Sequence, residues 1–502
     1  MHQGLSATGL PRPALVFSAL FVLAAIPVSL STILPLVDYP DHLARMYLLA
    51  HLPDSPTLQT YYATDWHPLP NLAMDAIVPM LSRVIPLVSA GKLFVLATFL
   101  LLAGGVAALH RVLAGRWTLW PCLAFSLLYN RVFLWGFLNY LFGVGLALCA
   151  FAAWIALRER SAATRMIVSA VFCLATYFSH LMAYGVLGLL IFGYEVGLLW
   201  RHRAAVTQWA RELLVAGLPF VPPAAILMIG SAGAASGATH FGSPWRKLDL
   251  LFSIFDNYSR PFDVACFVLA LGAFAVGAWR RWIRLDPRMA LPLSLLGLAF
   301  LALPSQLFTG SGADHRLPLV LALVGVAATS WVGPEPRIER RFLAGALALF
   351  LLRLGVVTAS WHASDREYAA VLAAFETVPM GSRIAVAFPP GALHVDATPL
   401  AHLPTWAIAQ REAFVPILMA FPTQQPVSLK QPYRDLAALL PPERLWRALV
   451  AGRAPLDPAQ REGLESFDFV AFTDAKPFTV AGANGLEPVY TDARFGIYRL
   501  KH

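Results

Sequence analysis

The apolar run 14–36 and the segment Asp38-Tyr39-Pro40-Asp41-His42-Leu43-Ala44-Arg45 that follows it decide the fold. The run carries no charged residue, and it exceeds the roughly 18 apolar residues that indicate a transmembrane helix. The polar segment begins where this first span ends. The sequence therefore predicts two carboxylates, an imidazole and a guanidinium at a membrane interface.

A short helix is predicted directly after the first span. Asp38 can cap this helix, and Pro40 fits its first turn. Apolar residues then recur at the helical spacing expected of an amphipathic helix on the membrane surface: Leu43, Met46, Leu49 and Leu52. Asp41 and Arg45 share one face. Two interpretations stay open, a functional cluster, or a cap plus an exposed ion pair worth a few tenths of a kcal/mol.

The rest of the chain is equally apolar. Mean hydropathy is +0.62, with 58% hydrophobic and 13% charged residues. This pattern predicts a polytopic α-helical membrane protein with about 11 transmembrane helices. The expected spans are 14–36, 92–110, 117–131, 136–157, 166–182, 184–200, 213–230, 262–279, 289–304, 317–332 and 342–360.

The basic residues indicate topology and not nucleic-acid binding. Residues 361–502 hold 13 Lys and Arg against 14 Asp and Glu, so the excess base lies in the membrane part. Alternate connections there carry 16 bases against five acids, and the others carry eight against nine. The positive-inside rule then places the N-terminus in the cytoplasm, with Asp38 and the C-terminal residues outside.

Two domains are expected. Residues 1–360 form the transmembrane domain, with outer loops 37–91, 231–261 and 305–316. Residues 361–502 alternate between helical and strand patterns, which predicts an extracytoplasmic α/β domain. Its expected helices are 364–378, 442–450 and 457–465, and its expected strands are 382–388, 467–472 and 495–500.

No P-loop, dinucleotide fingerprint, HExxH or GxSxG motif is present. The polar groups face outward, where nucleotide cofactors are scarce, so an activated substrate must come from the membrane. A lipid-phosphate-linked sugar fits this requirement. Transfer from it needs a carboxylate that accepts the acceptor's proton and positive charge that stabilises the departing phosphate.

Candidate residues for these roles lie in the outer segments. Asp38 or Asp41 is the expected catalytic base. The expected donor phosphate ligands are Arg316, His315, Arg45, Arg260 and His180. Two alternatives stay open here, because Arg316 can simply extend its side chain to the interface and His180 can be a neutral, hydrogen-bonded histidine. A further hypothesis places a divalent metal ion, Mg²⁺ or Mn²⁺, on Asp41, Asp65 and His67.

This layout resembles the GT-C superfamily of polytopic, polyprenyl-phosphate-sugar-dependent glycosyltransferases. The resemblance covers the whole chain as a layout and Asp38–Arg45 as a motif, and it assigns the family's acidic position to Asp38 and Asp41. The segment is also similar to the Asp-Pro-Tyr-Tyr-His-Leu-Arg-like stretch of oligosaccharyltransferase catalytic subunits. The Trp-Trp-Asp motif of those enzymes is missing, so asparagine glycosylation is not expected.

The sequence therefore predicts a glycosyltransferase at the outer face of a bacterial plasma (inner) membrane. It would move a sugar from a polyprenyl-phosphate donor to a lipid or envelope-glycan acceptor. The alternatives are a non-catalytic transporter or scaffold in envelope polysaccharide assembly, and a polymerase or acyl transferase with another base. Transporters favour charges near the membrane midplane, whereas here the charges gather at one interface.

Overall fold

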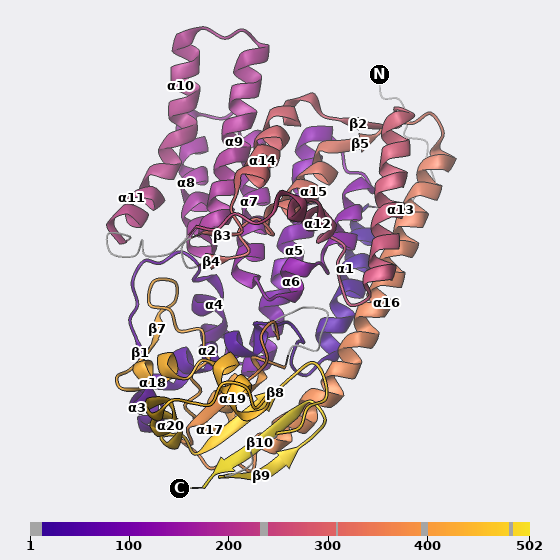
Figure 1. The fold of residues 1–502 in the computed structure, drawn as a ribbon. Helices are drawn as coiled ribbons and strands as arrows, with labels where there is room; N and C mark the ends of the chain where they lie inside the picture. The colour runs from indigo at the N-terminus through magenta and orange to yellow at the C-terminus, as the bar shows by residue number, and fades with distance from the viewer. Residues whose placement is uncertain (1–12, 231–238, 308–309, 393–399, 481–484, 502) are drawn as a thin grey trace.

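A computed structural model describes residues 13–230, 239–307, 310–392, 400–480 and 485–501. It shows a tall helical bundle with a small α/β domain at one end (Figure 1). Eight segments of the described chain are long and apolar enough to cross a membrane. They are α1 (Pro13–Leu30), α5 (Leu87–Ala114), α7 (Leu138–Ala156), α8 (Ala162–Ser179), α9 (Leu181–Arg201), α10 with α11 (Val206–Gly217 and Val221–Gly230), α13 (Arg260–Trp279) and α16 (Pro336–Phe375). Two shorter apolar helices, α14 (Ala290–Ala302) and α15 (Leu317–Ala328), complete the bundle. The chain is therefore a polytopic helical membrane protein.

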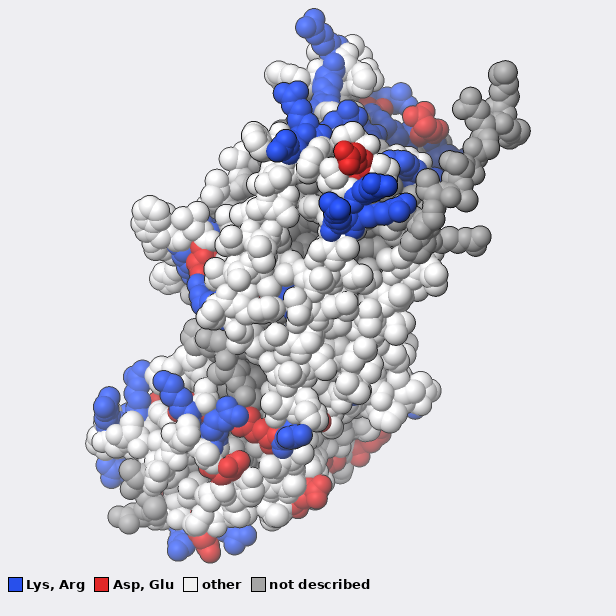
Figure 2. All heavy atoms as spheres, turned by 90° about the vertical axis from the view of Figure 1, so that its right-hand side faces the viewer, with Lys and Arg blue, Asp and Glu red and all other residues white. Residues whose placement is uncertain are grey.

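The connections rich in Arg gather at the end of the bundle far from the α/β domain. Here β2 (Ile283–Leu285) pairs with β5 (Thr329–Trp331), and an Arg201 guanidinium donates to the Pro287 carbonyl. Figure 2 shows Lys and Arg side chains over this end and a broad band with few charges between it and the α/β domain. The basic connections predicted from the sequence thus lie at one end of the molecule, and the α/β domain lies at the other.

The predicted span 117–131 is not an α-helix. The chain does pass from one end of the bundle to the other here, because Thr118 bonds His110 at the basic end and the Leu134 carbonyl accepts from Val37 at the other. It does so through the 3₁₀ helix η2 (Trp120–Leu127) and the short helix α6 (Arg131–Leu134). A hydropathy pattern cannot distinguish these conformations, since both place apolar side chains in the membrane.

Side chains of this irregular segment and of other helices compensate the backbone groups that it leaves unpaired. The Asn130 amide donates to the carbonyls of Leu127 and Leu128, at 2.7 and 3.1 Å. Arg353 of α16 donates to the Tyr129 carbonyl at 3.0 Å and also pairs with Asp263 of α13 at 3.0 Å. Non-helical backbone is tolerated at membrane depth when the protein satisfies it in this way. Arg353 is therefore a structural residue.

The C-terminal domain stands on α16. This helix runs for 40 residues through the predicted boundary at 360/361, so the helix expected from 364 is its continuation. Beyond it, four strands form a sheet in the order β6 (Ile384–Ala387), β8 (Phe469–Thr473), β10 (Phe495–Leu500) and β9 (Leu486–Thr491). β6 is parallel to β8, and the other pairs are antiparallel. Around the sheet lie α17 (Trp406–Arg411), α18 (Tyr433–Leu439), α19 (Pro442–Leu449) and α20 (Pro458–Glu465). The α/β architecture is confirmed, while β9, α17 and α18 had not been predicted.

The first outer loop is packed against this domain. The loop contains α2 (Tyr39–His51), α3 (Pro56–Tyr61), β1 (Tyr62–Thr64) and α4 (Ala73–Leu81). β1 pairs antiparallel with β7 (Val427–Leu429), and the Tyr62 hydroxyl donates to Ala413 and accepts from Val415. Most of α2 is buried. The burial arises because the C-terminal domain covers the helix.

Candidate functional site

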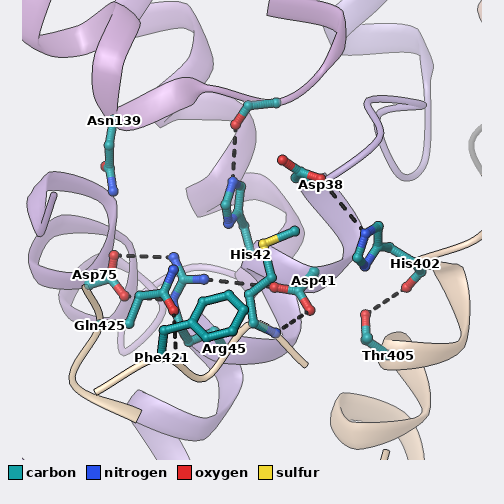
Figure 3. A network of polar contacts seen from close by, with 12 residues as sticks. Asp38, Asp41, His42, Arg45, Asp75, Asn139, His402, Thr405, Phe421 and Gln425 are labelled. Carbon is teal, nitrogen blue, oxygen red and sulfur yellow. Dashed lines mark hydrogen bonds and ion pairs between the residues drawn. The ribbon is translucent and has the colours of Figure 1, made fainter. Parts of the chain in front are cut away.

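Asp38 lies at the N-terminal end of α2, but its side chain forms no capping hydrogen bond in the described structure. Its backbone N–H donates to the Trp135 carbonyl at 3.1 Å, which fixes the main chain. The carboxylate is 16% exposed, and one of its oxygens lies 3.8 Å from His402 Nε2 (Figure 3). The interpretation of Asp38 as a simple cap is therefore wrong.

The environment of Asp38 favours its protonated form. Burial is the main cause and the Asp41 charge adds to it, whereas Arg45 and Arg316 act in the opposite direction. Together these effects raise the pKa of Asp38 to about 8. A carboxyl group with such a pKa can take up or release a proton near neutral pH.

Asp41 and Arg45 form a buried cluster with Asp75 of α4, also visible in Figure 3. Arg45 donates to the two Asp75 oxygens at 2.7 and 3.3 Å and lies 3.7 Å from Asp41. Asp41 is 0% exposed and accepts the Met419 N–H at 3.0 Å. Its pKa is raised to about 7, mainly by burial. The interpretation of an exposed ion pair was wrong, and Arg45 is held by two carboxylates.

The segment Trp135-Gly136-Phe137 lies between Asp38 and the residues His315 and Arg316. Gly136 has φ of +95°, and a Cβ there would lie 3.0 Å from the Asp38 Cβ, so the close approach requires glycine. The Trp135 ring lies 4.7 Å from the His315 ring, measured between centroids. The Arg316 guanidinium lies 4.4 Å from the centre of the Phe137 ring. Its charge acts on Asp38.

Arg316 is half-buried and retains donor capacity. The Tyr140 hydroxyl donates to the Arg316 carbonyl at 2.8 Å, which anchors the residue at the start of α15. The Arg316 Nε has no hydrogen-bond partner among the described residues, and Nη1 donates to the weakly accepting Met182 sulfur at 3.6 Å. Burial lowers the Arg316 pKa to about 10, so the group stays cationic at neutral pH. An anion is the partner that would best satisfy it.

The other predicted phosphate ligands contact other residues of the protein. His315 accepts from Arg246 of α12 (Pro244–Phe252) at 2.5 Å. Arg260 pairs with Asp249 at 2.5 Å and is largely exposed. His180 caps α9 by accepting the Met182 N–H at 3.1 Å, which agrees with the hydrogen-bonded alternative. Of the predicted ligands, Arg316 therefore acts on Asp38 through its charge, and His315 lies against the Trp135 ring.

The residues of the metal hypothesis do not converge. The Asp65 side chain is 84% exposed beside His67, whereas Asp41 is buried against Arg45 and Met419. In the described parts of the chain, no three His, Cys, Asp or Glu side chains are arranged to hold a metal ion. No reaction step can be built through a metal at these residues.

Sequence reasoning missed three parts of the site. His402 comes from the C-terminal domain, where a single histidine outside any motif gives no signal. Gly136 and Phe137 begin the predicted span 136–157, and Trp135 lies in the connection before it. Asp75 lies in the predicted outer loop 37–91, and only the fold places α4 beside Arg45.

The structure shows the layout that the sequence predicts, namely a multi-span bundle, helices after the first span and a small domain over an aspartate. The chain is similar to the crystal structure of ArnT from Cupriavidus metallidurans in the apo state, at 13% identity and a TM-score of 0.53 over 97% of this chain and 98% of that one. The crystal structure of the same ArnT bound to undecaprenyl phosphate matches at 14% identity and a TM-score of 0.53 over 98% of each chain. No family model and no curated protein matches the sequence. At such identity, the likeness establishes the fold.

Proposed function

We propose that this protein is a membrane glycosyltransferase that uses a polyprenyl-phosphate sugar as donor and a lipid or envelope glycan as acceptor. One observation carries the proposal. The Asp38 carboxylate, unused as a cap, lies at the domain-covered end of the bundle and is subject to the charge of the Arg316 guanidinium. A structure of the same fold is described as bound to undecaprenyl phosphate, which supports a lipid phosphate as ligand.

The chemistry assigns one role to each group. The acceptor oxygen bonds to the anomeric carbon of the sugar while the bond from that carbon to the phosphate oxygen breaks. Asp38 accepts the hydroxyl proton as general base. Arg316 stabilises the negative charge on the departing lipid phosphate. Asp41, Arg45 and Asp75 support α2, the helix on which Asp38 is placed.

The orientation in the membrane belongs to the same proposal. We infer eleven crossings, a cytoplasmic N-terminus and an extracytoplasmic C-terminal domain in a bacterial inner membrane. The basic end in Figure 2 supports this orientation, because Arg-rich connections remain in the cytoplasm. Asp38 then lies at the outer interface, where the phosphate of a polyprenyl lipid can reach it.

The experiment separates binding from transfer. The protein in lipid nanodiscs is tested for binding undecaprenyl phosphate and for transfer from a panel of undecaprenyl-phosphate sugars. Asp38→Asn should bind as the wild type does, with transfer reduced by roughly 10²–10⁴-fold. Arg316→Gln should weaken binding by about 10- to 100-fold, as expected for a hydrogen bond to a charged group.

Arg83→Gln is the matched control, since Arg83 is exposed on the same outer loop. It should leave both binding and transfer unchanged. Wild-type protein that binds undecaprenyl phosphate but transfers no sugar, in this assay and in cells, would favour the scaffold or transporter. Normal transfer by Asp38→Asn would show that Asp38 is not the general base.

A further inference from the structure

His402 enters the site from the C-terminal domain. It directly precedes η5 (Leu403–Thr405), and its carbonyl accepts from the Thr405 N–H at 3.1 Å and from the Thr405 hydroxyl at 2.7 Å. η5 and α17 pack against α2, so the backbone of His402 is fixed relative to the helix that begins beside Asp38. Figure 3 shows the imidazole turned toward the Asp38 carboxylate.

The imidazole is buried without a hydrogen bond. His402 is 6% exposed, and neither ring nitrogen has a hydrogen-bond partner among the described residues. A buried polar group left unpaired costs about 1–3 kcal/mol, so a partner is expected in some state of the protein. The nearest acid is Asp38, whose Oδ1 lies 3.8 Å from His402 Nε2.

This separation is about 1 Å longer than a hydrogen bond. Catalytic hydrogen bonds are often long in substrate-free enzymes and shorten when the site fills. A small rotation of either side chain closes the gap, because the Asp38 carboxylate is not held by a capping bond.

We propose that His402 is the positioning residue of Asp38, and that its Nε2–H closes onto Oδ1 when substrates fill the site. The inference rests on the proposed function and extends it. The second carboxylate oxygen is then directed at the acceptor hydroxyl, with Arg316 on the phosphate. The C-terminal domain thereby completes the active site in addition to covering it.

The charges around the pair agree with this role. Asp38 faces Asp41 and Arg45 of its own loop and Arg316 from α15, and His402 also faces His42. Burial lowers the His402 pKa to about 4, so the ring is neutral at pH 7 and keeps one N–H to donate. A hydrogen bond to the ionised carboxylate stabilises it, which opposes the effect of burial on Asp38.

Kinetics of His402→Leu test the proposal. The turnover number should fall about 10- to 100-fold while the KM for the donor and the binding of undecaprenyl phosphate stay unchanged. The acidic limb of the pH profile of kcat/KM should move to higher pH, because the ionised form of Asp38 loses a donor. His402→Gln keeps an N–H donor and should recover part of the turnover. His362→Leu, at an exposed histidine on α16, is the control and should have no effect.

A double-variant cycle distinguishes this inference from the proposed function. In Asp38→Asn, adding His402→Leu should cause no further loss of transfer, and the two changes should be non-additive in thermal unfolding with undecaprenyl phosphate bound. Full turnover by His402→Leu, or additive effects on unfolding, overturns the role of His402. Non-additive unfolding in a protein that transfers no sugar supports the Asp38–His402 pair and refutes the glycosyltransferase.

Discussion

Replacing Arg45 by Gln distinguishes the structural role that the fold gives this residue from the phosphate-binding role that its sequence position indicated. The guanidinium is 1% exposed and lies between Asp75, at 2.7 Å, and Asp41, at 3.7 Å. Removing it leaves two buried carboxylates, and breaking a buried ion pair from one side costs about 3–5 kcal/mol. We therefore expect Arg45→Gln to unfold at a clearly lower temperature than the wild type.

The loss of stability in Arg45→Gln should depend on pH and on the presence of Asp75. Without Arg45, the pKa of Asp41 rises further in the folded state, so the protein loses stability as pH increases toward that value. The difference from the wild type should grow between pH 5 and pH 8. The double variant Arg45→Gln with Asp75→Asn should regain part of the stability, because it buries one acid fewer.

Thermal unfolding followed by tryptophan fluorescence in nanodiscs measures these effects, with binding of undecaprenyl phosphate measured on the same samples. Arg83→Gln, exposed on the same loop, should unfold like the wild type. An Arg45→Gln protein with normal stability and lost undecaprenyl phosphate binding would refute the reasoning. Arg45 would then bind phosphate, and α2 would have to open to allow it.

Three other predictions concern pH, backbone and topology. The pKa of Asp38, raised from its ordinary value of 3.8 to about 8, gives stability that is full below pH 4 and is lost as pH rises through 8. Asp38→Asn should therefore melt higher than the wild type at pH 8.5 and near it at pH 4; an equal difference at both values contradicts the assignment. Gly136→Ala should reduce transfer by displacing Asp38. Gly115→Ala is the control, since Gly115 is also at positive φ but has nothing within 4 Å of its Cβ; it should unfold more easily and keep its transfer rate. Equal transfer by the two variants would contradict the role of Gly136 in placing Asp38. In a background without the natural cysteines, Asp54→Cys and Glu487→Cys should react with an impermeant thiol reagent in spheroplasts, and Arg203→Cys only after permeabilisation; the reverse pattern inverts the topology.

The bundle was largely predictable because a membrane leaves few choices. An apolar run must satisfy its own backbone groups, so a sequence such as that of α5 specifies a helix by itself. The region 117–131 is an exception, because side chains of distant residues, above all Arg353 and Asn257, donate hydrogen bonds to its backbone. Local hydropathy carries no information about such partners.

The site was predictable only where a membrane interface defines it. Asp38 follows the first span and Arg316 precedes a later one, so a common interface was enough to bring them together. His402 depends on how a separate domain sits on the bundle, and that placement arises from contacts such as Tyr62 with Ala413 and β1 with β7. Burial of Asp41 depends on the same docking, which is why an exposed ion pair seemed reasonable from the sequence.

The sequence does not show whether Asp38 or Asp41 is the catalytic base, and the geometry of α2 favours Asp38. Asp41 faces the interior of its loop, where the Met419 N–H takes one oxygen and Arg45 lies against the other. Asp38, three residues earlier, precedes the helix and faces Arg316 and His402 instead. A base must move a proton without disturbing the fold, and Asp41 cannot gain one without weakening its contact with Arg45. We therefore propose that Asp41 acts through its charge, which helps to raise the pKa of Asp38, and that Asp38 is the carboxylate that reacts.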